Sequence, residues 1–509
     1  MLLSKKNLPA IKDPFNGMIP PQSMFSLPEK VLQFGTGVFL RGLIDYYIDR
    51  ANRENIFNGR VVVVKSTGSG ETSAFNKQDG LYTLFMKSAN NQVDVNETVI
   101  CSAISRVMNA NHEWSDVLEC AVNPLIQVII SNTTETGITL LADDRISSQP
   151  PVSFPGKLIA FLFKRYSFFK GDPESGMVIL PTELIPGNGS KLAGIVNELA
   201  LTNNLDTAFI NWMNHSCDFC NTLVDRIVPG RMPKEEHLAA EKKFGYEDEL
   251  MIMSETYGLW AIETSSRRTR NILSFSKANQ GIYIVENIYK FLELKLRLLN
   301  GSHNLSCALG FIAGFDTVKD AMANQEFDGY MRHLILDEIA ASIVDENISL
   351  EDAKQFGAQV LERYRNPHIN FKWLDICVQD TAKIKIRAVP IVQKHFTKYG
   401  YVPDCIVMGF AAYILFMKSE KNSKLEYIGF INGREYLIND DFSGLLHDKW
   451  KNFSGLDLVI EVLKDKSLWD TDLSILKGFP ENVLYYLNIL RKNGFFNMME
   501  NSSLKSPIS

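Results

Sequence analysis

The chain has 509 residues, a formal net charge of −6 at neutral pH and a pI near 5.9. A length far above the usual ~150 residues per domain predicts two or three folding units. The acidic balance gives no support for nucleic acid or an anionic membrane surface as a partner. The sequence contains neither an apolar run of roughly 18 residues nor a signal-peptide core, so we expect a cytoplasmic protein that does not span a membrane.

The first half of the chain alternates strand and helix patterns. The apolar run KVLQF (30–34) ends in Gly35-Thr36-Gly37, and helical spacing follows over residues 38–52. A helix is expected over 157–166, and further strands over 61–64, 82–85, 98–105, 125–130, 177–180 and 222–228. From about residue 192 the pattern is mostly helical, and after 283 nearly every segment is. We therefore expect an α/β N-terminal domain over 1–280 and a mostly α-helical C-terminal domain over 281–509.

The glycine turn is a candidate dinucleotide site. Gly35-x-Gly37 stands between a strand and a helix, where backbone can approach a pyrophosphate at a helix N-terminus. Leu40 occupies the place of a third glycine, so the fingerprint is incomplete and a plain tight turn is the alternative. The next strand ends in Lys65, where an acidic residue would bind the ribose, so the residues leave both NAD and NADP open.

A second candidate site is KLRLLNGSH, which places Lys295, Asn300 and His303 within nine residues at the end of an apolar helix pattern. At about 100° per residue, Asn300 lies about 140° and His303 about 80° from Lys295, so the three share one side if the helix continues. Surrounding leucines would dehydrate the ammonium and favour loss of its proton, which suits metal-independent acid–base chemistry at a carbonyl. The alternative is a solvated lysine followed by an Asn-Gly-Ser C-cap.

The cysteines do not form a disulfide or zinc pattern. There are seven of them, scattered along the chain. Cys217 and Cys220 make one CxxC near His215, but no second ligand pair follows at metal spacing. We therefore expect structural cysteines and no metal.

Four ordered motifs occur between residues 34 and 303: FGTGVFLRG (34–42), Gly187-Asn188-Gly189, NTLVDRIVP (221–229) and KxxxxNxxH (295–303). Together they resemble the polyol-specific long-chain dehydrogenase/reductase family, the relatives of mannitol dehydrogenase. The resemblance implies an N-terminal Rossmann-type domain, a helical C-terminal domain and NAD as cofactor.

The same resemblance implies roles for single residues. Lys295 matches the catalytic acid/base, and Asn188 and Asn300 match the two amides that polarise the carbonyl. His303 matches the histidine that binds substrate and helps to position the lysine, and Asp225 matches a motif aspartate near the active site. The implied cofactor-binding residues are Phe34, Gly35, Gly37, Val38, Phe39, Arg41, Lys65, Asn132 and Thr133.

The likeness extends to one branch of the family. Phe39-Leu40-Arg41 stands where mannitol and mannonate dehydrogenases usually have Phe-His-Arg, and QDGLYT (78–83) and SNTTE (131–135) are similar to the branch that acts on a keto-hexuronate. This implies NADH-dependent, reversible reduction of D-tagaturonate to D-altronate in hexuronate catabolism. The substrate carboxylate then needs a cation, and an arginine fork suits it best. The candidates are Arg387, Lys383, Arg365, Lys385 and Arg363, although each alone is more often a structural or solvated charge.

Other functions remain open from the residues. A fructuronate (mannonate) dehydrogenase or a polyol dehydrogenase for mannitol or arabinitol would use the same catalytic group. A catalytically inactive nucleotide-sensing protein and a metal-dependent dehydrogenase are more distant alternatives. The sequence does not determine the oligomeric state, and both a monomer and a weak dimer are compatible with it.

Overall fold

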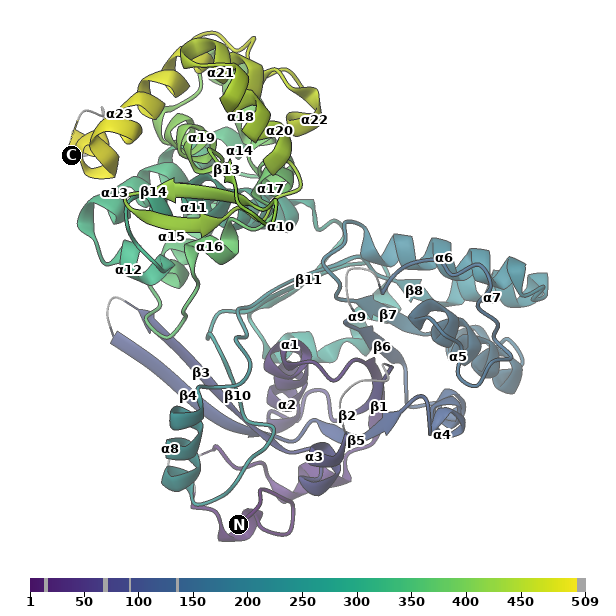
Figure 1. The fold of residues 1–509 in the computed structure, drawn as a ribbon. Coiled ribbons are helices and arrows are strands. Elements are labelled where there is room, and N and C mark those ends of the chain that lie inside the picture. Colours follow the sequence, from purple (N-terminus) through teal and green to yellow (C-terminus); the bar gives the residue numbers. More distant parts are fainter. Residues whose placement is uncertain (13–16, 67–71, 91–92, 134–136, 501–509) are drawn as a thin grey trace. The chain divides into compact units, whose positions relative to one another are not determined.

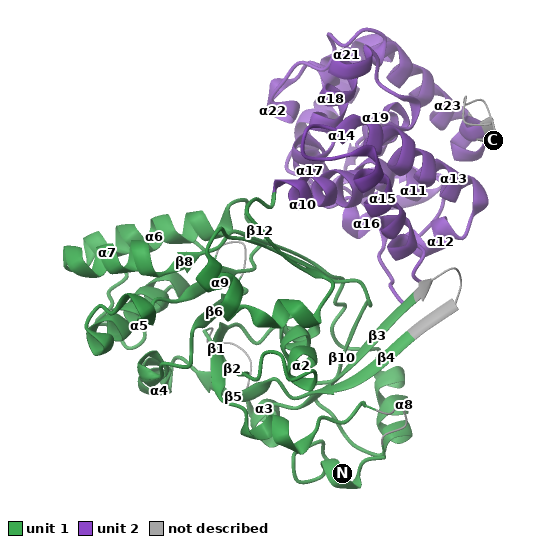
Figure 2. Cartoon of the chain, turned by 180° about the vertical axis from the view of Figure 1, so that it is seen from behind, with its two compact units in different colours: residues 1–88, 94–288 green, residues 89–93, 289–509 purple. Residues whose placement is uncertain are grey.

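The computed structural model describes residues 1–12, 17–66, 72–90, 93–133 and 137–500 (Figure 1). The chain divides into two compact units (Figure 2). Unit 1 comprises Met1–Ser88 and Asp94–Ile288, and unit 2 comprises Ala89–Val93 and Tyr289–Ser509. The predicted fold class is confirmed, because an α/β unit precedes a mostly helical one.

Unit 1 is built on a six-stranded parallel sheet with the order β5-β2-β1-β6-β7-β8. Its strands are β1 (Glu29–Phe34), β2 (Arg60–Lys65), β5 (Ile104–Asn109), β6 (Val128–Ser131), β7 (Val178–Pro181) and β8 (Asp218–Phe219). This is the order of a doubly wound sheet. From β1 the strands are first added on one side, through β2 to β5, and then on the other side, from β6 to β8, so the order switches sides between β1 and β6. Ligands bind such sheets at the carboxyl ends of the strands beside that switch point.

The strands are continuous apolar runs because both faces of the sheet are covered. In β2, Val61 and Val63 belong to one hydrophobic core, whereas Val62 and Val64 belong to another. The first core includes residues of the helix that follows β1, and the second includes residues of helices α5 to α7. The helices are α1 (Val38–Leu40), π-helix η3 (Arg41–Asp45), α2 (Tyr46–Arg53), α3 (Ser73–Lys77), α4 (Trp114–Glu119), α5 (Phe154–Phe169), α6 (Asn188–Thr202), α7 (Thr207–Ser216), α8 (Lys234–Phe244) and α9 (Arg267–Ile272).

Unit 1 also contains two smaller sheets, and their strands differ from those predicted from the sequence. One contains β3 (Tyr82–Asn90), β4 (Val93–Cys101) and β10 (Ile252–Ser254), and the other contains β9 (Thr222–Asp225), β11 (Leu259–Glu263) and β12 (Ile282–Val285). The single strand predicted over 98–105 is wrong, because β4 ends before Ser102 and β5 begins after it. The helical pattern predicted from residue 192 misses β10 to β12, which are too short to show a period.

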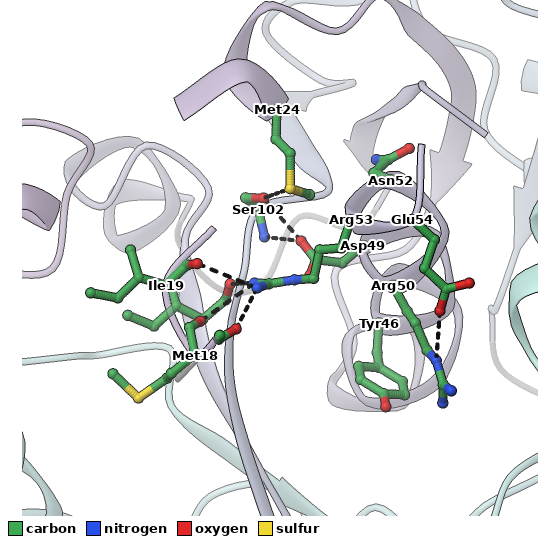
Figure 3. A network of polar contacts seen from close by, with 12 residues as sticks. Met18, Ile19, Met24, Tyr46, Asp49, Arg50, Asn52, Arg53, Glu54 and Ser102 are labelled. Atoms are coloured by element: carbon green, nitrogen blue, oxygen red, sulfur yellow. Dashed lines mark hydrogen bonds and ion pairs between the residues drawn. The ribbon is translucent and has the colours of Figure 1, made fainter. Parts of the chain in front are cut away.

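Arg53 and Asp49 tie the N-terminal segment to α2 and to the turn after β4 (Figure 3). The guanidinium of Arg53 forms an ion pair with Asp49 at 2.6 Å and donates to the carbonyls of Met18 at 3.4 Å and Ile100 at 2.8 Å. Asp49 also accepts from the backbone N–H of Ser102 at 2.7 Å and from its hydroxyl at 2.9 Å. The buried carboxylate is thereby compensated, and it fixes the turn that splits β4 from β5.

Unit 2 is mostly helical. Helix α19 (Asp404–Phe416) is buried on all sides, as expected for a helix that is apolar all round, and it packs against α11 (Ser302–Ile312) and α23 (Phe479–Glu500). A small antiparallel sheet of β13 (Glu420–Lys421), β14 (Tyr427–Ile431) and β15 (Arg434–Leu437) interrupts the helices. In the described part of the chain, no helix is long and apolar enough to cross a bilayer.

The remaining elements of unit 2 are α10 (Tyr289–Leu294), π-helix η7 (Lys295–Gly301), α12 (Val318–Met322), α13 (Gln325–His333), π-helix η8 (Leu334–Ile339), α14 (Ala340–Ile343), α15 (Leu350–Tyr364), α16 (Trp373–Ile376), α17 (Asp380–Arg387), α18 (Val389–Tyr399), α20 (Ser443–Asn452), α21 (Gly455–Leu463) and α22 (Lys466–Trp469). Short 3-10 turns in unit 1 are η1 (Leu8–Ala10), η2 (Gln22–Ser26), η4 (Cys120–Val122), η5 (Pro173–Ser175) and η6 (Ser274–Ala278). All seven cysteines are free and buried, which agrees with the absence of a disulfide pattern in the sequence.

Candidate active site

The turn after β1 offers space and donors to an anion. Gly35 has a φ of 132°, which favours glycine, and a Cβ there would lie 3.0 Å from the carbonyl oxygen of Asn132 and from Leu40. Gly37 has a φ of −63°, and a Cβ there would meet no described atom within 4 Å. A helix begins at Val38, and the first N–H groups of a helix have no intrahelical acceptor. This geometry fits the pyrophosphate of a dinucleotide.

Buried polar side chains form hydrogen bonds to this turn and to each other. Gln33 donates to the carbonyl of Gly35 at 3.2 Å and to the carboxyl group of Asp45 at 3.3 Å. Neither Gln33 nor Asp45 is exposed, and burial raises the pKa of Asp45 to about 7. The predicted cofactor residue Arg41 is 7% exposed, and its guanidinium donates to the carbonyl of Leu250 at 2.6 Å. This contact connects the helix after the turn to the segment before β10, and a direct contact of Arg41 with the cofactor stays a prediction.

The other predicted cofactor residues lie at the carboxyl ends of the parallel strands or in the turn that follows β1. Phe34 ends β1, Lys65 ends β2 and is 5% exposed, and Asn132 and Thr133 follow β6. Val38 and Phe39 are partly exposed in the first helical turn. Thr134 and Glu135, which belong to the same predicted loop, lie outside the described residues.

Glu183 orders the loop after β6, a role that the sequence did not indicate. It is 3% exposed, and its carboxylate accepts from the N–H and the hydroxyl of Thr133, each at 2.8 Å, and from the hydroxyl of Ser131 at 3.1 Å. Asn132 donates to the hydroxyl of Thr182 at 3.0 Å. The loop is thus held by side chains that follow the neighbouring strand β7.

Asn188 is the first residue of α6 and is fully engaged with main-chain atoms of unit 1. Its amide nitrogen donates to the carbonyls of Pro181, Glu183 and Thr222 at 3.0 to 3.1 Å. Its carbonyl oxygen accepts from the N–H groups of Gly189 and Thr222, both at 2.9 Å. The predicted contact of this amide with a substrate carbonyl stays a prediction.

The VDRIVP motif forms the end of β9. Asp225 is 6% exposed there, and its role near a substrate stays a prediction. The neighbouring Arg226 donates to the carbonyls of Glu255 at 2.9 Å and Gly42 at 2.8 Å, and lies 5.1 Å from the ring centre of Tyr46. Arg226 therefore connects this strand to the helix after β1.

The catalytic lysine predicted in unit 2 opens a π-helix. Lys295 is 8% exposed in η7, and the helix continues through Gly301, with a φ of −66°, into α11. The alternative of an Asn-Gly-Ser C-cap is therefore wrong. Residues five apart are hydrogen-bonded neighbours in a π-helix, so Lys295 and Asn300 come onto one face instead of lying about 140° apart.

His303 is held in a fixed plane by Tyr364. The two rings stack with centres 4.2 Å apart and an angle of 19°. The Tyr364 hydroxyl donates to the carbonyl of Leu299 at 2.7 Å and lies 2.9 Å from the hydroxyl of Ser302. Tyr364 ends α15, far along the chain from His303, so this contact was not predictable from the sequence pattern.

Hydrogen bonds through Asn304 and Asp380 hold Arg387 beside the predicted catalytic helix. It donates to the amide oxygen of Asn304 at 2.9 Å, and the Asn304 nitrogen donates to Asp380 at 2.6 Å. A Cβ at Gly301 would lie 3.3 Å from the carbonyl of Arg387, so glycine permits this approach. Burial raises the pKa of Asp380 to about 7. A residue next to His303 thereby orients one of the predicted carboxylate-binding cations.

The other predicted cations interact elsewhere in unit 2. Lys383 donates to the carbonyl of Ile376 at 3.0 Å. Arg365 forms ion pairs with Asp328 at 2.6 Å and Glu362 at 2.7 Å. Lys385 pairs with Asp470 at 2.6 Å, and Arg363 is buried. Arg387 is the best placed of the five because of its contact with the helix of Lys295.

These features define a dinucleotide-dependent oxidoreductase with a Rossmann-type unit and a helical unit. Residues 29–274 match the Mannitol dehydrogenase Rossmann domain, and residues 287–490 match the Mannitol dehydrogenase C-terminal domain. The chain therefore belongs to the mannitol dehydrogenase family, as its motifs predict.

Among curated relatives, the altronate oxidoreductase of Bacillus subtilis (strain 168) is 35% identical over 477 residues, which cover 93% of this chain and 95% of that protein. The altronate oxidoreductase of Klebsiella pneumoniae (strain 342) is 33% identical over 92% of this chain and 95% of its own length. Among solved structures, mannitol 2-dehydrogenase from Pseudomonas fluorescens, a ternary complex with NAD and D-mannitol, has a TM-score of 0.71 at 20% identity over the whole of both chains. A substrate-free D-sorbitol dehydrogenase has a TM-score of 0.74 at 20% identity and covers 97% of this chain and 99% of its own.

Proposed function

We propose that this protein catalyses the reversible, NADH-dependent reduction of D-tagaturonate to D-altronate. The observation that carries the proposal is the likeness to altronate oxidoreductases over more than nine-tenths of the chain. The lysine, asparagine and histidine on one continuous helix support an oxidoreductase, and Arg387 beside that helix supports an acidic substrate.

NAD fits the groups at the sheet edge. The open space at Gly37 and the helix N-terminus suit a pyrophosphate. Lys65 is 5% exposed, so little of its side chain is accessible to the 2′-phosphate of NADP. When bound, the nicotinamide supplies the hydride for the ketone carbon and accepts it in the reverse direction.

The residues of unit 2 then transfer the proton and stabilise the negative charge that develops on the carbonyl oxygen. In the reductive direction the Lys295 ammonium gives its proton to the carbonyl oxygen, and in the oxidative direction the amine takes it back. The Asn300 amide donates to the same oxygen as negative charge develops, and loss of one such donor typically costs about 10²- to 10³-fold in turnover. His303, fixed by Tyr364, orients a substrate hydroxyl, and Arg387 binds the carboxylate. The lysine and the amide together polarise the carbonyl group, as a Lewis-acidic metal ion would, so no metal takes part in these steps.

The test is NADH absorbance with purified protein and D-tagaturonate, with D-fructuronate and D-fructose in parallel, each with and without EDTA. We expect fast oxidation of NADH with D-tagaturonate alone, at the same rate in EDTA. Turnover with fructuronate or fructose instead would replace the substrate and keep the mechanism. No oxidation of NADH with any of the three substrates would favour the nucleotide-sensing alternative. The cytoplasmic location stays a prediction from the sequence, and the oligomeric state stays open.

A further inference from the structure

A second polar cluster in unit 2 shares no residue with the candidate active site. It consists of His333 at the end of α13, Glu338 in η8 and Cys405 in the first turn of α19. A ring nitrogen, a carboxylate oxygen and the thiol sulfur of these residues all lie within 4.8 Å of one another. Glu338 and Cys405 are buried, and His333 is half-buried. Only the fold brings these three side chains together.

Two residues of the cluster line a pocket of about 370 Å³. His333 and Glu338 line it together with Asp337, Asp404 and His395, whereas Cys405 is fully buried. Three carboxyl groups and two imidazoles thus converge on one space. Carboxylate, imidazole and thiolate are all ligands of divalent transition metals.

The imidazole of His333 is oriented for coordination. Its Nδ1 lies 3.0 Å from a carboxylate oxygen of Asp337, and its Nε2 lies 3.8 Å from a carboxylate oxygen of Glu338. A carboxylate on one ring nitrogen fixes the tautomer and turns the other nitrogen toward a metal, which is the usual arrangement of ligating histidines.

His395 is an independent sign of a ligand in the same pocket. Its Nδ1 lies 2.9 Å from the hydroxyl of Ser342, which itself donates to the main-chain carbonyl of Glu338 at 2.5 Å. The Ser342 hydroxyl proton is used in that hydrogen bond, so the hydroxyl oxygen can only accept from Nδ1. Nδ1 therefore carries the ring proton, and Nε2 carries a lone pair. His395 is 4% exposed, and its Nε2 is buried without a hydrogen-bond partner in the described part of the chain.

Glu338 keeps acceptor capacity for a cation. It accepts from the backbone N–H of Cys405 at 2.8 Å and of Ile406 at 3.0 Å, one on each carboxylate oxygen. Each oxygen has a second lone pair. The carboxylate can therefore bind a cation without losing either backbone contact.

We propose that this cluster, at the edge of the pocket, binds one Zn²⁺ ion through His333 Nε2, the Glu338 carboxylate and the Cys405 thiolate. His395 lies outside the 4.8 Å group but lines the same pocket, so it is the available fourth ligand. The mixed nitrogen, oxygen and sulfur set favours Zn²⁺ over Mg²⁺ or Ca²⁺. On binding, the Cys405 thiol releases its proton to water and no electron is transferred. The ion would connect the α13–η8 segment with α18 and α19, which is a structural role separate from hydride transfer.

The test uses the full-length chain after treatment with a chelator and dialysis. Cobalt(II) is the probe, because its visible absorption reports tetrahedral coordination and a bound thiolate adds a near-ultraviolet charge-transfer band. We expect one equivalent of cobalt per chain, displacement by one equivalent of Zn²⁺, and a higher midpoint of thermal unfolding with Zn²⁺. Cys405→Ser should remove the charge-transfer band, and His333→Asn should weaken Zn²⁺ binding at least about tenfold.

Two matched variants control for loss of any cysteine or histidine. Cys120→Ser and His447→Asn change residues outside the cluster and should bind cobalt as the unchanged chain does. His333 is half-buried, so its asparagine variant is expected to fold, which circular dichroism checks. Folded protein that binds no cobalt would overturn the proposal, and so would His333→Asn and Cys405→Ser variants that bind cobalt as tightly as the unchanged chain. NADH oxidation by the metal-free chain tests the proposed function separately.

Discussion

Unit 1 and unit 2 hold their functional groups by different means. In unit 1 the glycine turn depends on main-chain geometry, because Gly35 must adopt a positive φ and Gly37 must leave open space. In unit 2 the catalytic helix depends on side-chain contacts, because Tyr364 stacks on His303 and Asn304 orients Arg387. We therefore expect substitutions in unit 1 to act on cofactor binding and those in unit 2 to act on chemistry and substrate binding.

A π-helix occurs in each of these two helices, with different results. In η3 the extra residue accompanies the burial of Arg41, whose side chain donates to the carbonyl of Leu250. In η7 it aligns Lys295 with Asn300 on one face. Such π turns often mark functional sites. The same irregularity thus anchors the helix after the glycine turn in unit 1 and aligns the predicted proton donor in unit 2.

The largest expected effect is that of Lys295→Ala. Removal of the proton donor should lower turnover by about 10²- to 10⁴-fold, with NADH affinity nearly unchanged because the cofactor turn belongs to unit 1. Stopped-flow turnover and a fluorescence titration with NADH measure the two quantities. Lys290→Ala, which removes an exposed ion pair with Asp352, is the control and should be close to normal. Normal turnover of Lys295→Ala would contradict the mechanism.

Arg387→Met should come next. Loss of a charge-assisted hydrogen bond to the substrate carboxylate is worth about 1.5 to 3 kcal/mol, so KM for D-tagaturonate should rise about 10- to 100-fold. Arg365→Met is the matched control, because its guanidinium is paired with Asp328 and Glu362. Steady-state kinetics on both variants distinguish the two arginines, and an equal KM for both would remove Arg387 from the substrate site.

A pair of glycine substitutions separates folding from cofactor binding. Gly37→Ala should leave the free energy of unfolding within about 0.5 kcal/mol, since its Cβ meets no described atom. It should raise the Kd for NADH about tenfold if the pyrophosphate lies over the turn. Gly35→Ala should lower the free energy of unfolding by about 1 to 3 kcal/mol because of its positive φ. Urea unfolding and NADH titration test the pair, and an unchanged Kd in Gly37→Ala would argue against this location.

The smallest expected effect concerns pH. The pKa of Asp45 is raised to about 7 by burial, so its protonated form stabilises the fold at low pH. That contribution is complete below the unfolded pKa near 4 and is lost as the pH rises through 7. Asp45→Asn should remove this slope, so the variant should gain stability relative to the unchanged chain between pH 4 and 7. Urea unfolding at several pH values measures the difference, and parallel curves would show that Asp45 does not titrate in this range.

The sequence determined the fold class and predicted the residues of the two sites. Continuous apolar strands and the glycine turn predicted the doubly wound unit, because both depend on residues close together in the chain. The spacing of Lys295, Asn300 and His303 predicted the catalytic helix for the same reason. The sequence missed β10 to β12 because strands of a few residues show no clear period. It also joined β4 and β5 across Ser102, because the turn there is held by Asp49, which lies far away in the chain.

Only the tertiary structure decided which distant residues support those sites. Tyr364 on His303, Asp380 behind Asn304, and Glu183 under the loop after β6 are contacts between residues far apart in the chain. It also places Arg387 beside the helix of Lys295 and pairs Arg365 with Asp328 instead. Local patterns record which surface an element buries, whereas the partner of a buried polar group is set by packing between elements. For that reason the chain alone predicted the catalytic groups, and the fold was needed to show how they are held.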